Sequence, residues 1–148
     1  MLPRKELSII PLFIILITGV TPQLSEESPF VMKPKPEPYF VSEGEQGVVL
    51  ECSFSQKFLN KSRYESSWTA VTDDVPRHLT RNEVSFAKSR YDLLANDAHY
   101  NLRIRRVELL RDNGKFYCTI LDKETGSQKS AAATIVVVGE LSSSHCFL

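Results

Sequence analysis

The sequence lacks an excess of charge of either sign, because 18 basic residues balance 18 acidic ones in a chain of 148. A domain that binds nucleic acid needs a basic surface to neutralise phosphates, so we expect no nucleic-acid partner. Histidine is also scarce, and none of His78, His99 and His145 has a cysteine or carboxylate neighbour at metal-ligand spacing. We therefore expect no metal site.

Catalytic motifs are missing as well. The chain contains no Gly-x-Ser-x-Gly, no phosphate-binding glycine loop and no His-Glu-x-x-His. Each of these patterns places a nucleophile, a phosphate cradle or a metal where chemistry requires it. We therefore expect that the protein is not an enzyme and that it needs no cofactor.

Only one long apolar run is present, and it lies at the N-terminus. Arg4 and Lys5 precede the 12 residues from Ile9 to Val20. This length is typical of a signal peptide and falls short of the ~20 residues that a membrane-spanning helix needs. We expect a signal peptide over residues 1–20 and a secreted, extracellular product with no stable membrane span. An uncleaved signal anchor is the alternative.

Proline is concentrated just after this run, where residues 21–38 contain five of the eight prolines. Repeated proline removes backbone donors and favours an extended chain, so we expect a proline-rich linker over residues 21–37. At the other end, polar residues 142–144 are followed by Cys146, Phe147 and Leu148. We expect residues 141–148 to form a disordered tail.

Between these segments the hydrophobic pattern has a period of two, which predicts strands. Glycine, proline, aspartate or asparagine separates most of the strands, and helical spacing is limited to one turn over residues 107–111. Many short strands with regular turns predict one all-β sandwich or barrel over residues 38–140. The strands are expected at residues 48–54, 63–71, 90–94, 100–104, 116–120 and 130–138.

Two cysteines share the phase of the inward strand faces. Cys52 and Cys118 are 66 residues apart, and Trp68 follows Cys52 by 16. In an oxidising compartment such a pair closes a disulfide between two sheets, and the tryptophan packs against it. Since three cysteines are present, Cys146 is left over. The alternatives for Cys146 are an interchain bond in a dimer, a free thiol, or a tail created by alternative or truncated sequence.

A larger pattern resembles the immunoglobulin superfamily. It consists of Gly47–Cys52, Trp68, Asn101–Val107 and Asp112–Cys118. The resemblance implies an immunoglobulin-like antiparallel β-sandwich of variable or intermediate type. It also implies an ion pair between Arg90 and Asp112, for which the alternative is two unrelated surface charges. The implied core residues are Leu50, Trp68, Leu102, Ile104 and Phe116.

The chain departs from this family at one position. The family usually has a tyrosine two residues before the second cysteine, and its hydroxyl bonds back to the chain. Here that position is Phe116, and the tyrosine is Tyr117. We expect the hydroxyl bond to be lost or replaced.

Alternation also predicts a binding face and a modification site. If Phe116 points inward, then Tyr117, Thr119 and Leu121 point outward, and we expect them to contact a partner. Ordinary surface exposure is the alternative. Asn60 opens the acceptor sequence Asn-Lys-Ser, so we expect N-glycosylation there.

The leading hypothesis for function is a secreted recognition module that binds a cell-surface or extracellular protein, which could itself be another immunoglobulin-domain protein. Residues 89–118 look similar to the first domains of invertebrate neuronal and nephrin-like adhesion proteins, which implies cell adhesion or neuronal and synaptic organisation. A soluble immune receptor or defence protein is a second hypothesis. A fragment or short isoform of a longer receptor is the third.

Overall fold

The structure is a computed structural model and describes residues 27–139. The expected signal peptide, the start of the linker, the tail and Cys146 lie outside these residues. The described chain forms eleven strands in two sheets, a 3-10 turn η1 (Gln56–Phe58) and a one-turn helix α1 (Leu109–Asp112). The smaller sheet contains β1 (Phe30–Met32), β3 (Val49–Leu50), β4 (Ser53–Phe54), β8 (Tyr91–Asn96) and β9 (His99–Ile104). The larger sheet contains β2 (Tyr39–Ser42), β5 (Tyr64–Thr72), β6 (Val75–Arg81), β7 (Val84–Ser85), β10 (Gly114–Asp122) and β11 (Gln128–Val138).

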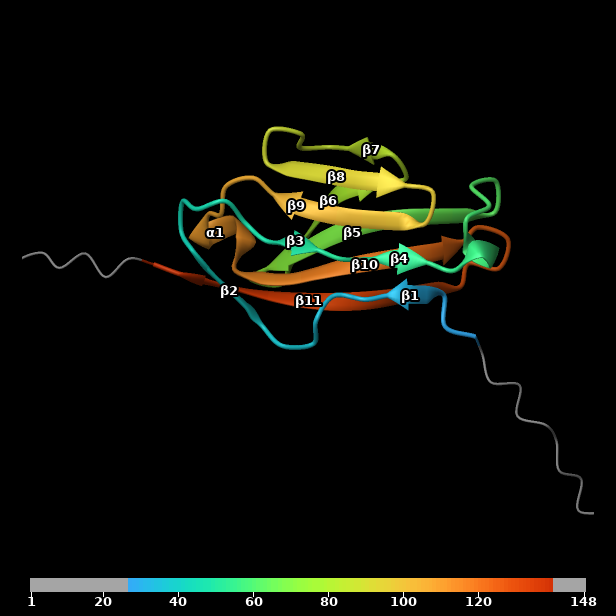
Figure 1. Cartoon of the computed structure of the whole chain (residues 1–148), viewed down its shortest axis with the longest axis horizontal. Helices are drawn as coiled ribbons and strands as arrows, with labels where there is room; N and C mark the ends of the chain where they lie inside the picture. The colour runs from blue at the N-terminus through green and yellow to red at the C-terminus, as the bar shows by residue number, and fades with distance from the viewer. Residues whose placement is uncertain (1–26, 140–148) are drawn as a thin grey trace, which may run out of the picture.

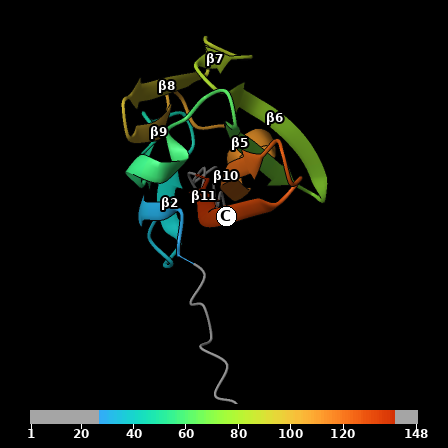
Figure 2. The same ribbon diagram turned by 90° about the vertical axis from the view of Figure 1, so that its right-hand side faces the viewer.

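The expected all-β sandwich is confirmed. In the larger sheet the strand order is β2-β11-β10-β5-β6-β7, and in the smaller sheet β9 pairs with β3, β4 and β8 while β1 pairs with β4. Every strand pair is antiparallel except β2 with β11, which is parallel. Figure 1 shows the strands running along the long axis, and Figure 2 shows β8 and β9 on one side and β5, β6 and β10 on the other.

The two ends of the sandwich differ. The loop end is formed by loop 55–63 and by the turns at residues 82–83, 97–98 and 123–127. The hairpin end carries α1 and the β5–β6 turn, where Asp73 and Asp74 have positive φ angles of 49° and 61°. Two consecutive positive φ angles suit the twist of a two-residue hairpin.

The disulfide joins the two sheets at the centre of the core, and it confirms the cysteine pairing. Cys52 and Cys118 are both fully buried and bonded to each other. Cys118 lies opposite Trp68 across β10 and β5, and the indole Nε1 donates to the carbonyl of Tyr100 at 2.7 Å. The other expected core residues, Leu50, Leu102, Ile104 and Phe116, are each 0% exposed.

The first cysteine lies in a break between β3 and β4. Its backbone N–H donates to the Oδ1 of Asn101 at 2.9 Å, and its carbonyl accepts from the N–H of Tyr100 at 2.7 Å. A side-chain amide thus replaces one backbone acceptor beside the disulfide. Strands β3 and β4 therefore both remain paired with β9, although the backbone hydrogen-bond ladder is interrupted between them.

Strand β1 lies in the segment that the sequence assigned to the linker 21–37. Phe30 packs on Phe54 with ring centroids 5.6 Å apart, and Ser55 donates its N–H to the carbonyl of Pro29 at 2.9 Å. The sandwich therefore begins before the expected boundary at residue 38. The sequence pattern did not predict β1 because proline dominates its neighbourhood. Phe30 of this strand packs at the edge of the core.

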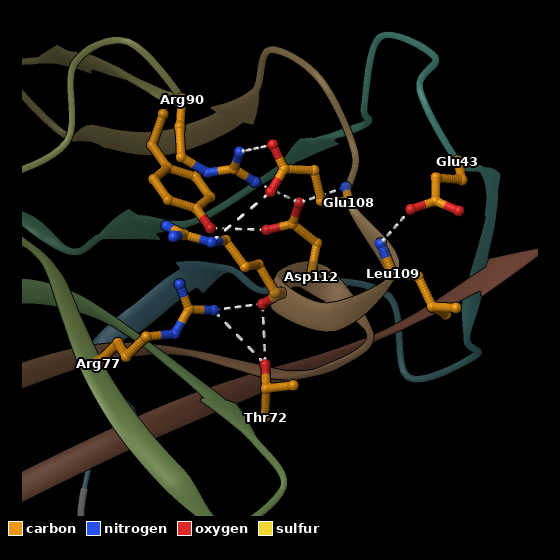
Figure 3. A network of polar contacts seen from close by, with 9 residues as sticks. Glu43, Thr72, Arg77, Arg90, Glu108, Leu109 and Asp112 are labelled. Carbon is orange, nitrogen blue, oxygen red and sulfur yellow. Dashed lines mark hydrogen bonds and ion pairs between the residues drawn. The ribbon is translucent and has the colours of Figure 1, made fainter.

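A buried carboxylate braces the hairpin end (Figure 3). Asp112 is 0% exposed, and its Oδ2 accepts from Arg90 Nη2 at 2.9 Å and from the Glu108 N–H at 2.8 Å. Arg90 also pairs with Glu108. The hydroxyl of Tyr91 donates to the other Asp112 oxygen at 2.6 Å. Burial, followed by this bond, raises the pKa of Tyr91 and keeps it a donor.

This network replaces the tyrosine hydroxyl bond that Phe116 cannot make. A tyrosine hydroxyl does hold the chain before β10, but it comes from β8 rather than from β10 itself. The ring of Tyr91 lies 6.5 Å from that of Phe116, so the two share one region of the core. The expected Arg90–Asp112 ion pair is present in the same network.

Candidate partner-binding face

The candidate site is the solvent side of the larger sheet, which we call the outer face. Strand β10 runs through its middle, between β5 and β11. Tyr117 lies between Thr69 and Ala132, and Thr119 lies between Ser67 and Ser130. Cross-strand partners point to the same side of a sheet, so these small side chains surround the tyrosine on a shared surface.

The three residues expected on this face are not equally accessible. Tyr117 and Leu121 are half-buried, whereas Thr119 is only 7% exposed. The hydroxyl of Thr119 is hydrogen-bonded to that of Ser130 at 2.7 Å. Thr119 therefore contributes to the sheet more than to the accessible surface, and the expectation that it faces solvent needs this correction.

Sequence reasoning missed two exposed apolar side chains of the outer face. Phe40 is 70% exposed on β2, and Val138 is 49% exposed at the end of β11. Phe40 lies opposite Val136 in the parallel pair, while the alternating residues Val41 and Val137 are buried. The signal was present, because residues 135–138 are apolar in both phases and one phase must face outward.

Charged groups border this apolar surface. Glu65, next to Leu121 in register, pairs with Arg81 of β6 at 3.2 Å, and Lys115 is exposed beyond Tyr117. The hydroxyl of Thr69 lies 3.3 Å from Nδ1 of His78. Apolar and aromatic side chains with polar and charged residues around them are typical of a protein–protein interface.

Two cavities lie elsewhere, at the loop end. One of about 530 Å³ lies between loop 55–63 and the turns at 82–83 and 97–98. The other, of about 420 Å³, shares Phe58 and Tyr64 with it and is bordered by Arg63 and Asp122. Neither is lined by Tyr117. Small-molecule sites are concave, so the outer face suits a protein better than a small ligand.

The loop end carries an ion pair of its own. Arg63 Nη2 lies 2.7 Å from Asp122 Oδ2, with Nε at 3.3 Å. This hydrogen-bonded pair lowers the pKa of Asp122 to about 2 and raises that of Arg63. Burial raises the pKa of Tyr100 to about 12, and its hydroxyl is hydrogen-bonded to Thr80 and to the carbonyl of Asn82. All of these groups hold their usual charge at neutral pH.

The predicted acceptor Asn60 is exposed in loop 55–63. Its Oδ1 accepts from the N–H of Ser62 at 3.0 Å and from the hydroxyl of Ser62 at 2.6 Å. The two polar residues of the acceptor sequence therefore contact each other at the surface.

The remaining observations concern compartment and kinship. Within residues 27–139, no three His, Cys, Asp or Glu side chains are grouped to hold a metal ion, and no helix has the length and apolarity to cross a membrane. The disulfide indicates an oxidising compartment of the extracellular type. Comparison with protein-family models and with curated protein sequences finds no match for this chain.

Proposed function

We propose that this chain is a secreted recognition module of the immunoglobulin superfamily that binds an extracellular or cell-surface protein through its outer face. The strand order supports the superfamily and the variable type. In variable-type domains two further strands extend the sheet that holds the second cysteine. Here β6 and β7 stand in that position beyond β5.

One observation carries the binding proposal: the outer face exposes Phe40 and Val138 along its β2–β11 edge and carries the half-buried Tyr117 on the neighbouring strand β10. An exposed apolar sheet edge next to a tyrosine-bearing strand, with charged residues around it, favours an interaction site. Tyrosine and phenylalanine are also frequent anchors at protein interfaces. The partner's own apolar side chains would be buried against these rings.

The biological role follows from the resemblance of residues 89–118 to first domains of adhesion proteins. We propose cell adhesion, in neuronal or synaptic organisation, with the immune and receptor-fragment hypotheses as competitors. A binding screen of the full secreted chain against a panel of extracellular domains separates them. Adhesion-type partners support the proposal, and partners restricted to immune receptors or microbial surfaces contradict it.

The outer face is tested by three single substitutions, Phe40→Asp, Tyr117→Asp and Leu121→Asp. Each puts a carboxylate where the proposed interface excludes water, so we expect affinity for the screened partner to fall at least tenfold, or about 1.4 kcal/mol. The matched control is Val31→Asp, because Val31 is 72% exposed but belongs to the smaller sheet. If the three variants bind as the wild type does while Val31→Asp loses binding, the smaller sheet is the interface.

A further inference from the structure

We propose that the cavity of about 530 Å³ at the loop end is the seat of the first sugar of an N-glycan carried by Asn60. The inference rests on glycosylation at Asn60 and is independent of the partner-binding proposal. The proposed occupant of the cavity is covalently attached to loop 55–63 of the same chain. The sugar class is N-acetylglucosamine, which begins every N-linked glycan.

The attachment atom is available. Both hydrogen bonds from Ser62 go to Oδ1 of Asn60, and among residues 27–139 the Nδ2 atom has no hydrogen-bond partner. Glycosylation joins Nδ2 to C1 of the sugar, while Nδ2 loses a proton and the lipid diphosphate of the oligosaccharide donor leaves. No other atom of the acceptor loop has to change its bonds.

The cavity adjoins the attachment residue, which borders it without lining it. Leu59 and Lys61, the two neighbours of Asn60 in the chain, both line it, and so does Phe58 two residues earlier. Loop 55–63 therefore supplies both the attachment point and one wall. The loop returns through Arg63 and Tyr64, whose N–H groups donate to the carbonyl of Asn60 at 3.1 and 2.8 Å. These bonds fix the direction in which Asn60 leaves the backbone.

The lining matches the two sides of a sugar ring. Phe58 and Tyr64 pack in a tilted arrangement with their ring centroids 5.0 Å apart, and together with Ile120 they offer an apolar wall to the C–H face of the sugar ring. Asn82, Asp97 and His99 lie on the opposite turns and can exchange hydrogen bonds with hydroxyl and acetamido groups. The volume is within the ~300–1,000 Å³ of typical ligand sites.

An ion pair closes one side of the cavity. Lys61 pairs with Glu83 across the mouth, from loop 55–63 to the β6–β7 turn. Both side chains are largely exposed, Lys61 at 71% and Glu83 at 70%. Such an exposed pair contributes little stability and can part to admit a sugar.

The experiment uses the full chain secreted from a eukaryotic cell line, with its glycan trimmed enzymatically to one N-acetylglucosamine. Intact mass establishes occupancy. We expect this glycoform to melt about 4 °C above the unglycosylated Asn60→Gln variant, because the sugar buries apolar surface that is otherwise wet. In the NMR spectrum, we expect the acetamido methyl signal to shift upfield, because a sugar held in this cavity is within reach of the ring currents of Phe58, Tyr64 and Tyr100, which all line it.

A second pair of variants assigns the effect to the cavity. In a Phe58→Leu background the difference in melting temperature between glycosylated and unglycosylated chains should fall by at least half. In a Phe86→Leu background it should persist, because Phe86 is exposed and does not line the cavity. Should Phe58→Leu fail to fold, the methyl shift in the wild-type glycoform decides alone. An unmodified Asn60, equal melting temperatures with and without sugar, or a methyl shift equal to that of the free sugar would each overturn the proposal.

Discussion

Replacing Asp112 with alanine should destabilise the domain more than any other single change to its polar groups. The carboxylate is fully buried and receives three hydrogen bonds, from Arg90, Tyr91 and the backbone of Glu108. Asp112→Ala removes the acceptor of all three. It leaves the Tyr91 hydroxyl, in a side chain that is 1% exposed, with no oxygen to receive its proton.

The size of the effect follows from what remains buried. Removing one partner of a buried ion pair costs about 3–5 kcal/mol, because the other charge stays behind uncompensated. Arg90 keeps its bond to Glu108, and its side chain is 16% exposed, so water can solvate part of the guanidinium charge. We therefore expect the lower value, about 3 kcal/mol. Asp112→Asn keeps one acceptor oxygen and should cost about half as much.

Urea denaturation at 25 °C measures this cost, with the fluorescence of Trp68, the only tryptophan, as the probe. A double-mutant cycle adds Arg90→Met and the combined variant, whose loss should be smaller than the sum of the two single losses. Tyr91→Phe isolates one hydrogen bond and should cost about 1 kcal/mol. The reasoning fails if Asp112→Ala lies within 0.5 kcal/mol of the wild type, or if the two single losses simply add.

Two further predictions concern other parts of the chain. Replacing both Cys52 and Cys118 with alanine opens a loop of 66 residues and should lower the free energy of unfolding by about 4 kcal/mol, measured by urea titration; a loss under 1 kcal/mol would contradict it. For the Arg63–Asp122 pair, the folded pKa of about 2 lies below the ordinary carboxyl value near 3.9, so its stabilisation is complete above about pH 4 and disappears as pH falls toward 2. The unfolding free energies of wild type and Arg63→Gln should therefore converge at low pH, and an offset that stayed constant down to pH 2 would be inconsistent with this origin.

The core of the fold could be predicted because alternation and side-chain chemistry agreed there. Leu50 and Cys52 are two residues apart, as are Phe116 and Cys118. Side chains two residues apart on a strand point to the same face, so each of these residues must face the core together with its neighbour. The expected single helical turn at residues 107–111 likewise appears as α1, shifted to Leu109–Asp112. The observed bounds of this turn differ from the expected ones because the ends of a short element depend on tertiary hydrogen bonds, which a local sequence pattern does not contain.

The parts that could not be predicted depend on contacts between distant strands. The edge strand β1 exists because Phe30 meets Phe54, although proline dominates its neighbourhood. Thr119 is covered by neighbours on β5 and β11 that alternation cannot identify. Phe40 lies on the outer face because β2 pairs in parallel with β11, and this long-range pairing cannot be predicted from local sequence. The partner of Tyr91 was equally hidden, because nothing local ties that hydroxyl to Asp112, 21 residues away.

The parallel pairing of β2 with β11 determines how the domain responds to tension. The described chain starts beside β1 at one end of the sandwich and finishes with β11 at the other (Figure 1), so a pull on its two ends draws β2 and β11 past each other once the short β1 has detached. Their hydrogen bonds are then loaded in shear and must break together, whereas an antiparallel hairpin pulled from its open end would unzip bond by bond. Forced unfolding is governed by the unfolding rate, which this geometry slows. Even after rupture, the segment between Cys52 and Cys118 stays closed, so the domain would lengthen only by its outer segments and could refold around the intact disulfide when the load is released.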